Sequence, residues 1–188
     1  MSNINKKFII ALTVVVVLII FIILCIKPEK EYDSSVLEVN FLTDNKELII
    51  SNSLPMTDEV GVFIDSSNSI DGTTSYVEFE VKSNIEDKVK YELYLTKDTH
   101  ELEVPVKFVK VYLTDYNDNK LKYFDGASVP TFYDLRLAST NVGGKLIYSG
   151  YLKNKGSQKF KLRMWVADTY ELTAEEIKFS TELNVGIK

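Results

Sequence analysis

Residues 160–166 read FKLRMWV, and this stretch indicates the fold class. Apolar side chains occupy every second position, which is the period of a strand with one buried face and one wet face. Such strands belong to antiparallel sheets. The pattern predicts that Phe160, Leu162 and Met164 face inward and that the intervening side chains face outward: Lys161, Arg163 and Trp165.

The same period recurs along the chain, at residues 77–82, 89–95 and 177–187. Weaker strand patterns fit residues 36–42, 47–51, 104–114, 131–138 and 146–153, with turn-forming residues between the runs. In residues 104–114 the apolar phase slips between Phe108 and Val109, which suggests a β-bulge. Eight or nine short strands predict an all-β domain, an antiparallel β-sandwich of jelly-roll or immunoglobulin-like type.

An uncharged run precedes these strands. Residues 8–26 read FIIALTVVVVLIIFIILCI, and a helix of that length spans roughly 28 Å, close to the thickness of a bilayer's hydrocarbon core. We therefore predict a transmembrane helix with the lipid bilayer as its partner. It follows a short leader at residues 1–7 and leads through a polar tether, residues 27–35, to a domain at residues 36–188.

Cleavage of this run is not expected. It is longer than a usual signal-peptide core, and no small-residue cleavage site follows it. A lipoprotein signal would need small residues before Cys25, where Ile22, Ile23 and Leu24 stand. The sequence leaves open whether Cys25 carries a lipid.

The side of the membrane follows from the order of the segments. Lys6 and Lys7 flank one end of the run and Lys27 and Lys30 the other, so the positive-inside count favours a cytoplasmic N-terminus only slightly. The whole domain follows the run, as in an uncleaved signal anchor. We predict a single-pass protein of the cell membrane with its C-terminal domain outside.

Charge and cysteine content argue against nucleic acid as a partner and against a disulfide bond within the domain. The formal net charge is −5 and the sequence pI is about 5.1, so no overall basic field attracts nucleic acid. Cys25 is the one cysteine of the chain. Residues 36–188 therefore contain no internal disulfide, and their stability has to come from the β-core.

Candidate chemistry is sparse. His100 is the only histidine, and zinc sites and Ser-His-Asp triads need further partners, so we expect it in a polar loop. Residues 115–119 read DYNDN, with oxygen ligands spaced as in a calcium loop. Lys120 and Gly126, however, stand where that loop needs glycine and glutamate, which favours a polar hairpin tip between residues 110–113 (KVYL) and 120–124 (KLKYF).

Residues 54–58, LPMTD, resemble a sortase signal but lack its glycine, and we expect a loop in which Thr57 or Asp58 caps a turn. No catalytic, cofactor-binding or metal-binding residue is predicted, and no cofactor. The protein is therefore predicted not to be an enzyme.

Trp165 lies on the polar side of its strand beside Lys161 and Arg163. An exposed tryptophan among cations would mark a partner contact formed by these three residues. A loop that covers Trp165 is the alternative, and of the two it is the one we expect.

Four segments occur in a particular order: residues 51–61 (SNSLPMTDEVG), 76–82 (YVEFEVK), 90–95 (KYELYL) and 159–168 (KFKLRMWVAD). This order resembles surface proteins of Firmicutes and related wall-less bacteria and, more remotely, the camelysin and TasA group of biofilm-matrix proteins. The resemblance implies a secreted jelly-roll sandwich that sometimes assembles by lending an N-terminal strand. This chain departs from the group in lacking a cleavable signal and a metalloprotease motif.

The predicted function is a non-enzymatic, membrane-anchored surface domain for adhesion, envelope or matrix assembly. Its partner would bind exposed strand edges, by strand addition or self-association, or the Trp165 face. The alternative is an accessory subunit of a pilus-like or secretion complex. The strand at residues 36–42, VLEVNFL, either closes its own sheet or pairs with a neighbouring copy, and we expect the first.

Overall fold

The computed structural model describes residues 36–43, 48–51, 54–69, 75–100, 103–124, 126–172 and 178–188. Eight strands make up most of this part of the chain: β1 (Leu37–Phe41), β2 (Leu48–Ser51), β3 (Ser75–Ser83), β4 (Val89–Lys97), β5 (Val109–Asp115), β6 (Lys145–Leu152), β7 (Ser157–Val166) and β8 (Lys178–Ile187). A one-turn helix, α2 (Asp58–Gly61), and a short 3₁₀ helix, η2 (Lys122–Phe124), complete the described elements.

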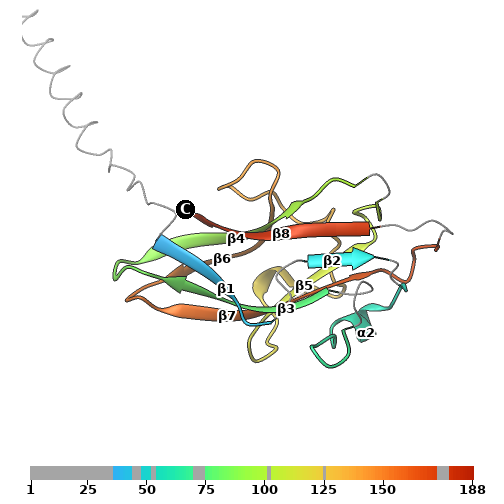
Figure 1. Ribbon diagram of the computed structural model, residues 1–188, viewed down its shortest axis with the longest axis horizontal. Helices are drawn as coiled ribbons and strands as arrows, with labels where there is room; N and C mark the ends of the chain where they lie inside the picture. The colour runs from blue at the N-terminus through green and yellow to red at the C-terminus, as the bar shows by residue number, and fades with distance from the viewer. Residues whose placement is uncertain are drawn as a thin grey trace, which may run out of the picture. The chain divides into compact units, whose positions relative to one another are not determined.

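The strands form two antiparallel four-stranded sheets that pack face to face as a sandwich (Figure 1). One sheet, sheet A, has the order β1-β3-β7-β5, and the other, sheet B, has the order β2-β8-β4-β6. Odd-numbered strands thus lie in sheet A and even-numbered strands in sheet B, so each connection crosses between sheets. None of the eight strands pairs with the next one along the chain, an order that differs from that of immunoglobulin domains.

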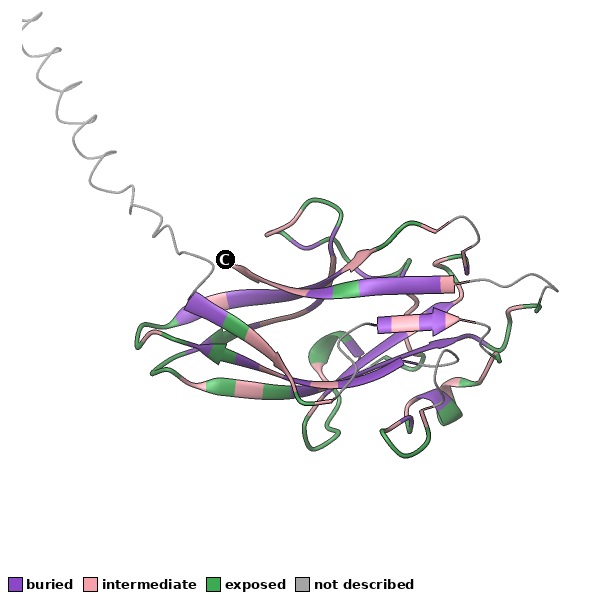
Figure 2. Ribbon diagram, viewed as in Figure 1, coloured by how far each residue is buried: buried purple, intermediate pink, exposed green. Residues whose placement is uncertain are grey.

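Alternation explains the core. Phe160, Leu162 and Met164 on β7 are fully buried between the sheets, as predicted. The ring of Phe79 on β3 stacks on Phe160, with ring centroids 5.3 Å apart. Figure 2 shows buried residues along the strands of both sheets, and the fully buried apolar side chains of the two sheets form one core.

Two details of the predicted strands are wrong. Residues 131–138 form no strand. Their backbone makes turns, and its two β-bridges are isolated ones, Lys110 with Thr131 and Leu137 with Lys145. The phase slip at Phe108 is no bulge, because β5 begins one residue later and pairs with β7 in continuous register. The register shift among the described ladders lies instead between β4 and β6, at Leu93 and Tyr94.

β1 closes its own sheet, as expected for residues 36–42. It pairs with β3 from Leu37 opposite Ser83 to Phe41 opposite Phe79. The backbone hydrogen bonds that flank this ladder involve Val36 and Leu42. Backbone groups alternate in direction along an antiparallel strand, so those of Leu37, Val39 and Phe41 point to the outer edge.

The predicted membrane helix at residues 8–26, the tether at residues 27–35 and Cys25 lie outside the described residues. Among the residues that are described, no helix has both the length and the apolar character needed to cross a bilayer.

The strand phase of β7 predicts two contrasting substitutions. Leu162→Asp places a carboxylate in the core and should lower the free energy of unfolding by several kcal/mol, a large share of a domain's usual ~5–15 kcal/mol. Lys159→Gln, at an exposed position of the same strand, should leave the urea midpoint nearly unchanged. Equal effects of the two changes would contradict the assigned phase.

Candidate functional site: a covering segment held over Trp165

The outer face of sheet A is covered by residues 54–69, here called the covering segment, which includes α2. Near its start the Met56 amide donates a hydrogen bond to the Val166 carbonyl (2.9 Å), and Met56 forms a parallel bridge with Ala167. At the start of α2 the Asp58 carboxylate accepts hydrogen bonds from Lys110 Nζ (3.3 Å) and the Val129 amide (2.9 Å). Backbone and side-chain contacts therefore fix this segment to the strands below it.

Gly61 lets α2 approach the sheet closely. A Cβ atom at this position would lie only 2.1 Å from the indole ring of Trp165. The absence of a side chain therefore allows the helix backbone to lie directly on the ring, and Trp165 has no exposed surface. Among the described residues its indole Nε1 has no hydrogen-bond partner, so burial beneath α2 is apolar in character.

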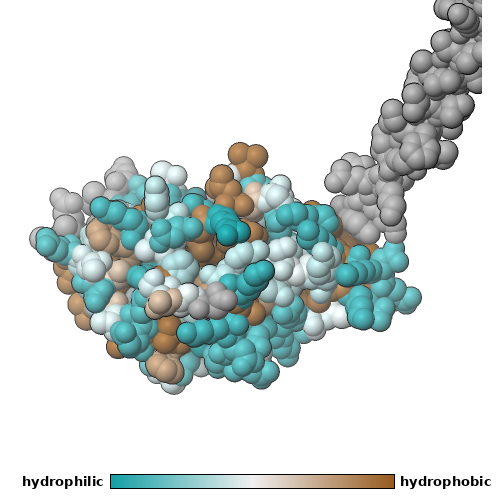
Figure 3. Space-filling model, turned by 180° about the vertical axis from the view of Figure 1, so that it is seen from behind, coloured by the Kyte–Doolittle hydropathy of each residue, from teal (hydrophilic) through white to brown (hydrophobic). Residues whose placement is uncertain are grey.

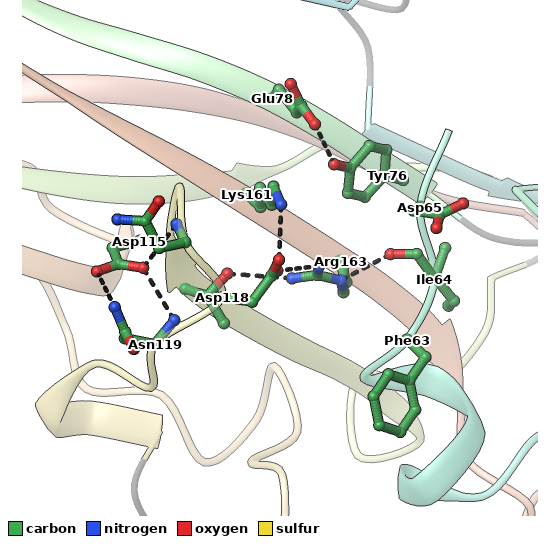
Figure 4. Close-up of polar contacts among 12 residues, drawn as sticks. Phe63, Ile64, Asp65, Tyr76, Glu78, Asp115, Asp118, Asn119, Lys161 and Arg163 are labelled. Carbon is green, nitrogen blue, oxygen red and sulfur yellow. Dashed lines mark hydrogen bonds and ion pairs between the residues drawn. The ribbon is translucent and has the colours of Figure 1, made fainter. Parts of the chain in front are cut away.

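Arg163 forms the centre of the site (Figure 4). Its side chain is 5% exposed and donates three hydrogen bonds: Nε to the Ile64 carbonyl (2.7 Å), Nη1 to Thr114 Oγ1 (3.1 Å) and Nη2 to Asp118 Oδ1 (2.6 Å). The first of these acceptors belongs to the covering segment, the second to β5 and the third to the turn after β5. One guanidinium thus joins three parts of the chain.

Asp118 balances the positive charge. It also accepts a hydrogen bond from Lys161 Nζ (2.7 Å), and its backbone φ of 62° is left-handed, which aspartate tolerates better than most residues. Burial raises the pKa of its carboxyl, but the hydrogen bonds from Lys161 and Arg163 outweigh burial and lower it. Asp118 is therefore ionised at neutral pH.

The DYNDN stretch, residues 115–119, forms the turn that contains Asp118. The Asp115 carboxylate accepts hydrogen bonds from the amides of Asn117 and Asn119, both 2.9 Å. Asp118 is committed to Arg163 and Lys161. The predicted polar turn is confirmed and its two carboxylates are engaged with groups of the chain itself, but the predicted hairpin is wrong, because residues 120–124 form an isolated bridge and η2 in place of a strand.

Trp165 and Arg163 lie on the outer side of β7, as predicted, but both are buried, so the hypothesis of an exposed partner contact at these residues is wrong. The alternative, a loop over Trp165, is confirmed, and Lys161 is half-buried between Asp118 and the ring of Tyr116. Alternation shows which side of β7 a residue occupies, but the segment that covers that side comes from a distant part of the chain. Residues 54–57 form a loop that leads into α2. Thr57 is the N-cap residue, but its side chain makes no capping hydrogen bond.

His100 follows β4 in a loop, as expected, but it has partners that the sequence did not reveal. Its Nε2 lies 2.6 Å from Ser180 Oγ, and that hydroxyl donates to Asp98 Oδ2 (2.8 Å). All three residues border an open cleft of ≈ 540 Å³ beside β8.

This arrangement differs from a nucleophilic triad. The Ser180 hydroxyl donates its hydrogen bond to Asp98. His100 Nε2 therefore has to donate a hydrogen bond to Ser180 Oγ, and it cannot act as the base that activates this serine. The serine also stands between the other two residues, where a triad places the histidine. The three side chains satisfy one another's hydrogen bonds and make no activated nucleophile.

A buried carboxylate on sheet B has the role that Arg163 has on sheet A. Glu92 is 1% exposed and accepts hydrogen bonds from the Ser139 amide (2.8 Å), the Thr140 amide (3.2 Å) and Lys188 Nζ (2.7 Å). Burial raises the pKa of Glu92, but the hydrogen bonds from Lys188 and Ser139 exceed that effect and lower it. Glu92 thus holds the loop before β6 on the outer face of sheet B.

Within the described ranges, no three histidine, cysteine, aspartate or glutamate side chains form a group able to hold a metal ion. No family model matches the chain, and no curated protein or solved structure matches it significantly. The likeness to the camelysin and TasA group therefore stays a prediction.

The packing of Gly61 on Trp165 predicts a fluorescence change. Gly61→Ala should push α2 away from the ring, increase acrylamide quenching of this single tryptophan, and cost about 1–3 kcal/mol of stability. Gly126→Ala is the matched control, because a Cβ there meets nothing closer than 3.6 Å. Unchanged quenching in the first variant would refute the close packing of α2.

The Glu92 contacts predict a dependence on pH. A pKa below the ordinary 4.5 in the folded state stabilises the fold above that value, and the stabilisation is lost as pH falls through the folded pKa. Glu92→Gln should therefore lower the free energy of unfolding by about 1–3 kcal/mol at neutral pH. The gap between variant and wild type should narrow toward acid pH in urea titrations.

Lys188→Met removes one donor to Glu92 and should give a smaller loss in the same direction. A gap that widened toward acid pH would show that Glu92 is not held as a carboxylate.

Proposed function

We propose that the protein is a membrane-anchored, non-enzymatic surface domain that binds a protein partner in adhesion, envelope or matrix assembly. The apolar run at residues 8–26 is its transmembrane helix, the N-terminus is cytoplasmic, and the β-sandwich domain lies outside. Assignment of the sandwich to the jelly-roll type follows from the family resemblance and belongs to the same proposal.

One observation carries the binding role: the covering segment displays apolar side chains while its backbone is fixed. Leu54 is 66% exposed, Val60 57% and Phe63 73%. Figure 4 shows Phe63 beside the Arg163 site without a drawn polar contact. Exposed apolar side chains on a fixed backbone lose little conformational freedom on binding, which favours a protein contact.

The face seen in Figure 3 is largely hydrophilic, with hydrophobic atoms in small groups between polar side chains. Scattered groups of this kind are normal on monomeric proteins. The loop before β6 also exposes three apolar residues, Tyr133 (67%), Leu137 (66%) and Val142 (105%), so the choice of the covering segment rests on how its backbone is fixed by β7 and Arg163.

A second contact surface is the outer edge of β1. Outward backbone groups of Leu37, Val39 and Phe41 provide donors and acceptors to an added strand. Strand addition there would extend sheet A without disturbing the β1–β3 ladder. It is the route by which a partner strand, or a strand of another copy, would bind.

Two considerations bear on the class of function. The buried charges, Arg163 and Glu92, are each hydrogen-bonded to loops, and Ser180 has no activating base, so the described side chains favour a scaffold over a catalyst.

An accessory subunit of a pilus-like or secretion complex is the alternative function. It is favoured by the Val- and Ile-rich run at residues 8–26, which suits helix packing within a membrane.

Membrane anchoring is tested on the full chain in cells. It should stay with the membrane pellet after a carbonate wash, and protease added outside intact cells should degrade the domain. Val15→Arg with Leu18→Arg places two charges in the apolar run at roughly 2.5–3.5 kcal/mol each, and should release the chain from the pellet. A wild-type chain that washes off, or a domain that resists protease until cells are opened, would contradict the proposal.

A further inference from the structure

The covering segment combines apolar and acidic chemistry. Residues 54–69 contain no lysine or arginine. Exposed Glu59 and half-buried Asp65 flank the apolar residues Val60 and Phe63, and hydrogen bonds lower the pKa of both carboxyls. At neutral pH this surface is therefore apolar and negatively charged, and it suits a partner that is apolar and positively charged.

The chain itself carries a surface of that kind, here called the cationic strip: Lys88, Lys90 and Tyr151. Lys88 Nζ lies 4.1 Å from the centroid of the Tyr151 ring, and Lys90 Nζ lies 6.0 Å from it. Tyr151 on β6 stands opposite Lys90 on β4 and is 55% exposed. The strip offers an aromatic ring and two ammonium groups, which complement Phe63 and the carboxylates of the covering segment.

These two surfaces lie at opposite ends of the sandwich. α2 lies near one end in Figure 1, and the turns that join β3 to β4 and β6 to β7, next to the cationic strip, lie at the other. One molecule cannot bring them together. Two copies can, through a head-to-tail contact in which different surfaces meet.

We propose that the covering segment of one copy docks on the cationic strip of a second copy, with Phe63 against Tyr151 and Glu59 against Lys88 and Lys90. This inference rests on the proposed binding role of the covering segment and names its partner. A pair of copies still has one unoccupied covering segment and one unoccupied cationic strip. Further copies can therefore bind through the same contact and form a linear assembly. The negative charge of the covering segment disfavours an anionic lipid surface as its occupant.

Sedimentation velocity of the full chain in detergent micelles tests the contact over a range of concentrations. The wild type should associate, and Phe63→Ala should weaken association by about tenfold. Association should also weaken as salt rises from about 0.05 M to about 0.5 M, because salt screens exposed charges. Phe63 is an exposed side chain, so thermal unfolding should confirm an intact fold.

Charge reversal provides the decisive comparison. Glu59→Lys alone, and Lys88→Glu with Lys90→Glu alone, should each abolish association, since like charges then face each other. An equimolar mixture of the two variants should associate again, because each copy now meets an opposite charge on the other. Glu171→Lys, at an exposed position outside both surfaces, is the matched control and should associate as the wild type does.

A wild type that is monomeric at every concentration would overturn the proposal and leave the covering segment to a different protein or to lipid. Association that survives both reversals would also overturn it, since contacts elsewhere would then join the copies. Neither result depends on which side of the membrane the domain occupies, so failure here is distinguishable from failure of the anchoring experiment.

Discussion

The arrangement of this domain depends on one constraint: no described strand pairs with its neighbour in sequence. Each connection leaves one sheet and enters the other, so every ladder joins strands that are distant along the chain. The long connections have to run over the outer faces of the sandwich, where their backbone groups need partners. Two buried charged side chains meet that need, Arg163 on sheet A and Glu92 on sheet B.

These two residues have the same role with opposite charge. Arg163 donates to the covering segment and to the turn after β5, while Glu92 accepts from the loop before β6 and from Lys188. A buried charge is stable only when paired and hydrogen-bonded, and each of these has several partners. Because the partners come from separate parts of the chain, each charge fixes loops that sheet hydrogen bonding alone would leave unsupported.

Fixing the loops has a functional consequence. The polar side chains that were candidates for a catalytic or metal site are hydrogen-bonded to other groups of the chain: Asp118 to Arg163, Asp115 to an amide of its own turn, and Ser180 to Asp98. The covering segment exposes Glu59 together with apolar side chains, of which Phe63 is the most exposed. This division of roles supports the binding function proposed above.

The sequence by itself determined the all-β class and the inward face of β7, because a period of two depends only on the local alternation of side chains. Whether the strand at residues 36–42 closes its own sheet or pairs with another copy is a matter of long-range pairing, which the structure decided by placing β1 beside β3. Tertiary structure alone decided that Trp165 and Arg163 are covered, that residues 131–138 form no strand, and that His100 meets Ser180. Alternation indicates which side of a sheet a residue faces, but not which distant segment lies against that side. That choice depends on long-range packing, here the absence of a side chain at Gly61 and the three acceptors that converge on Arg163.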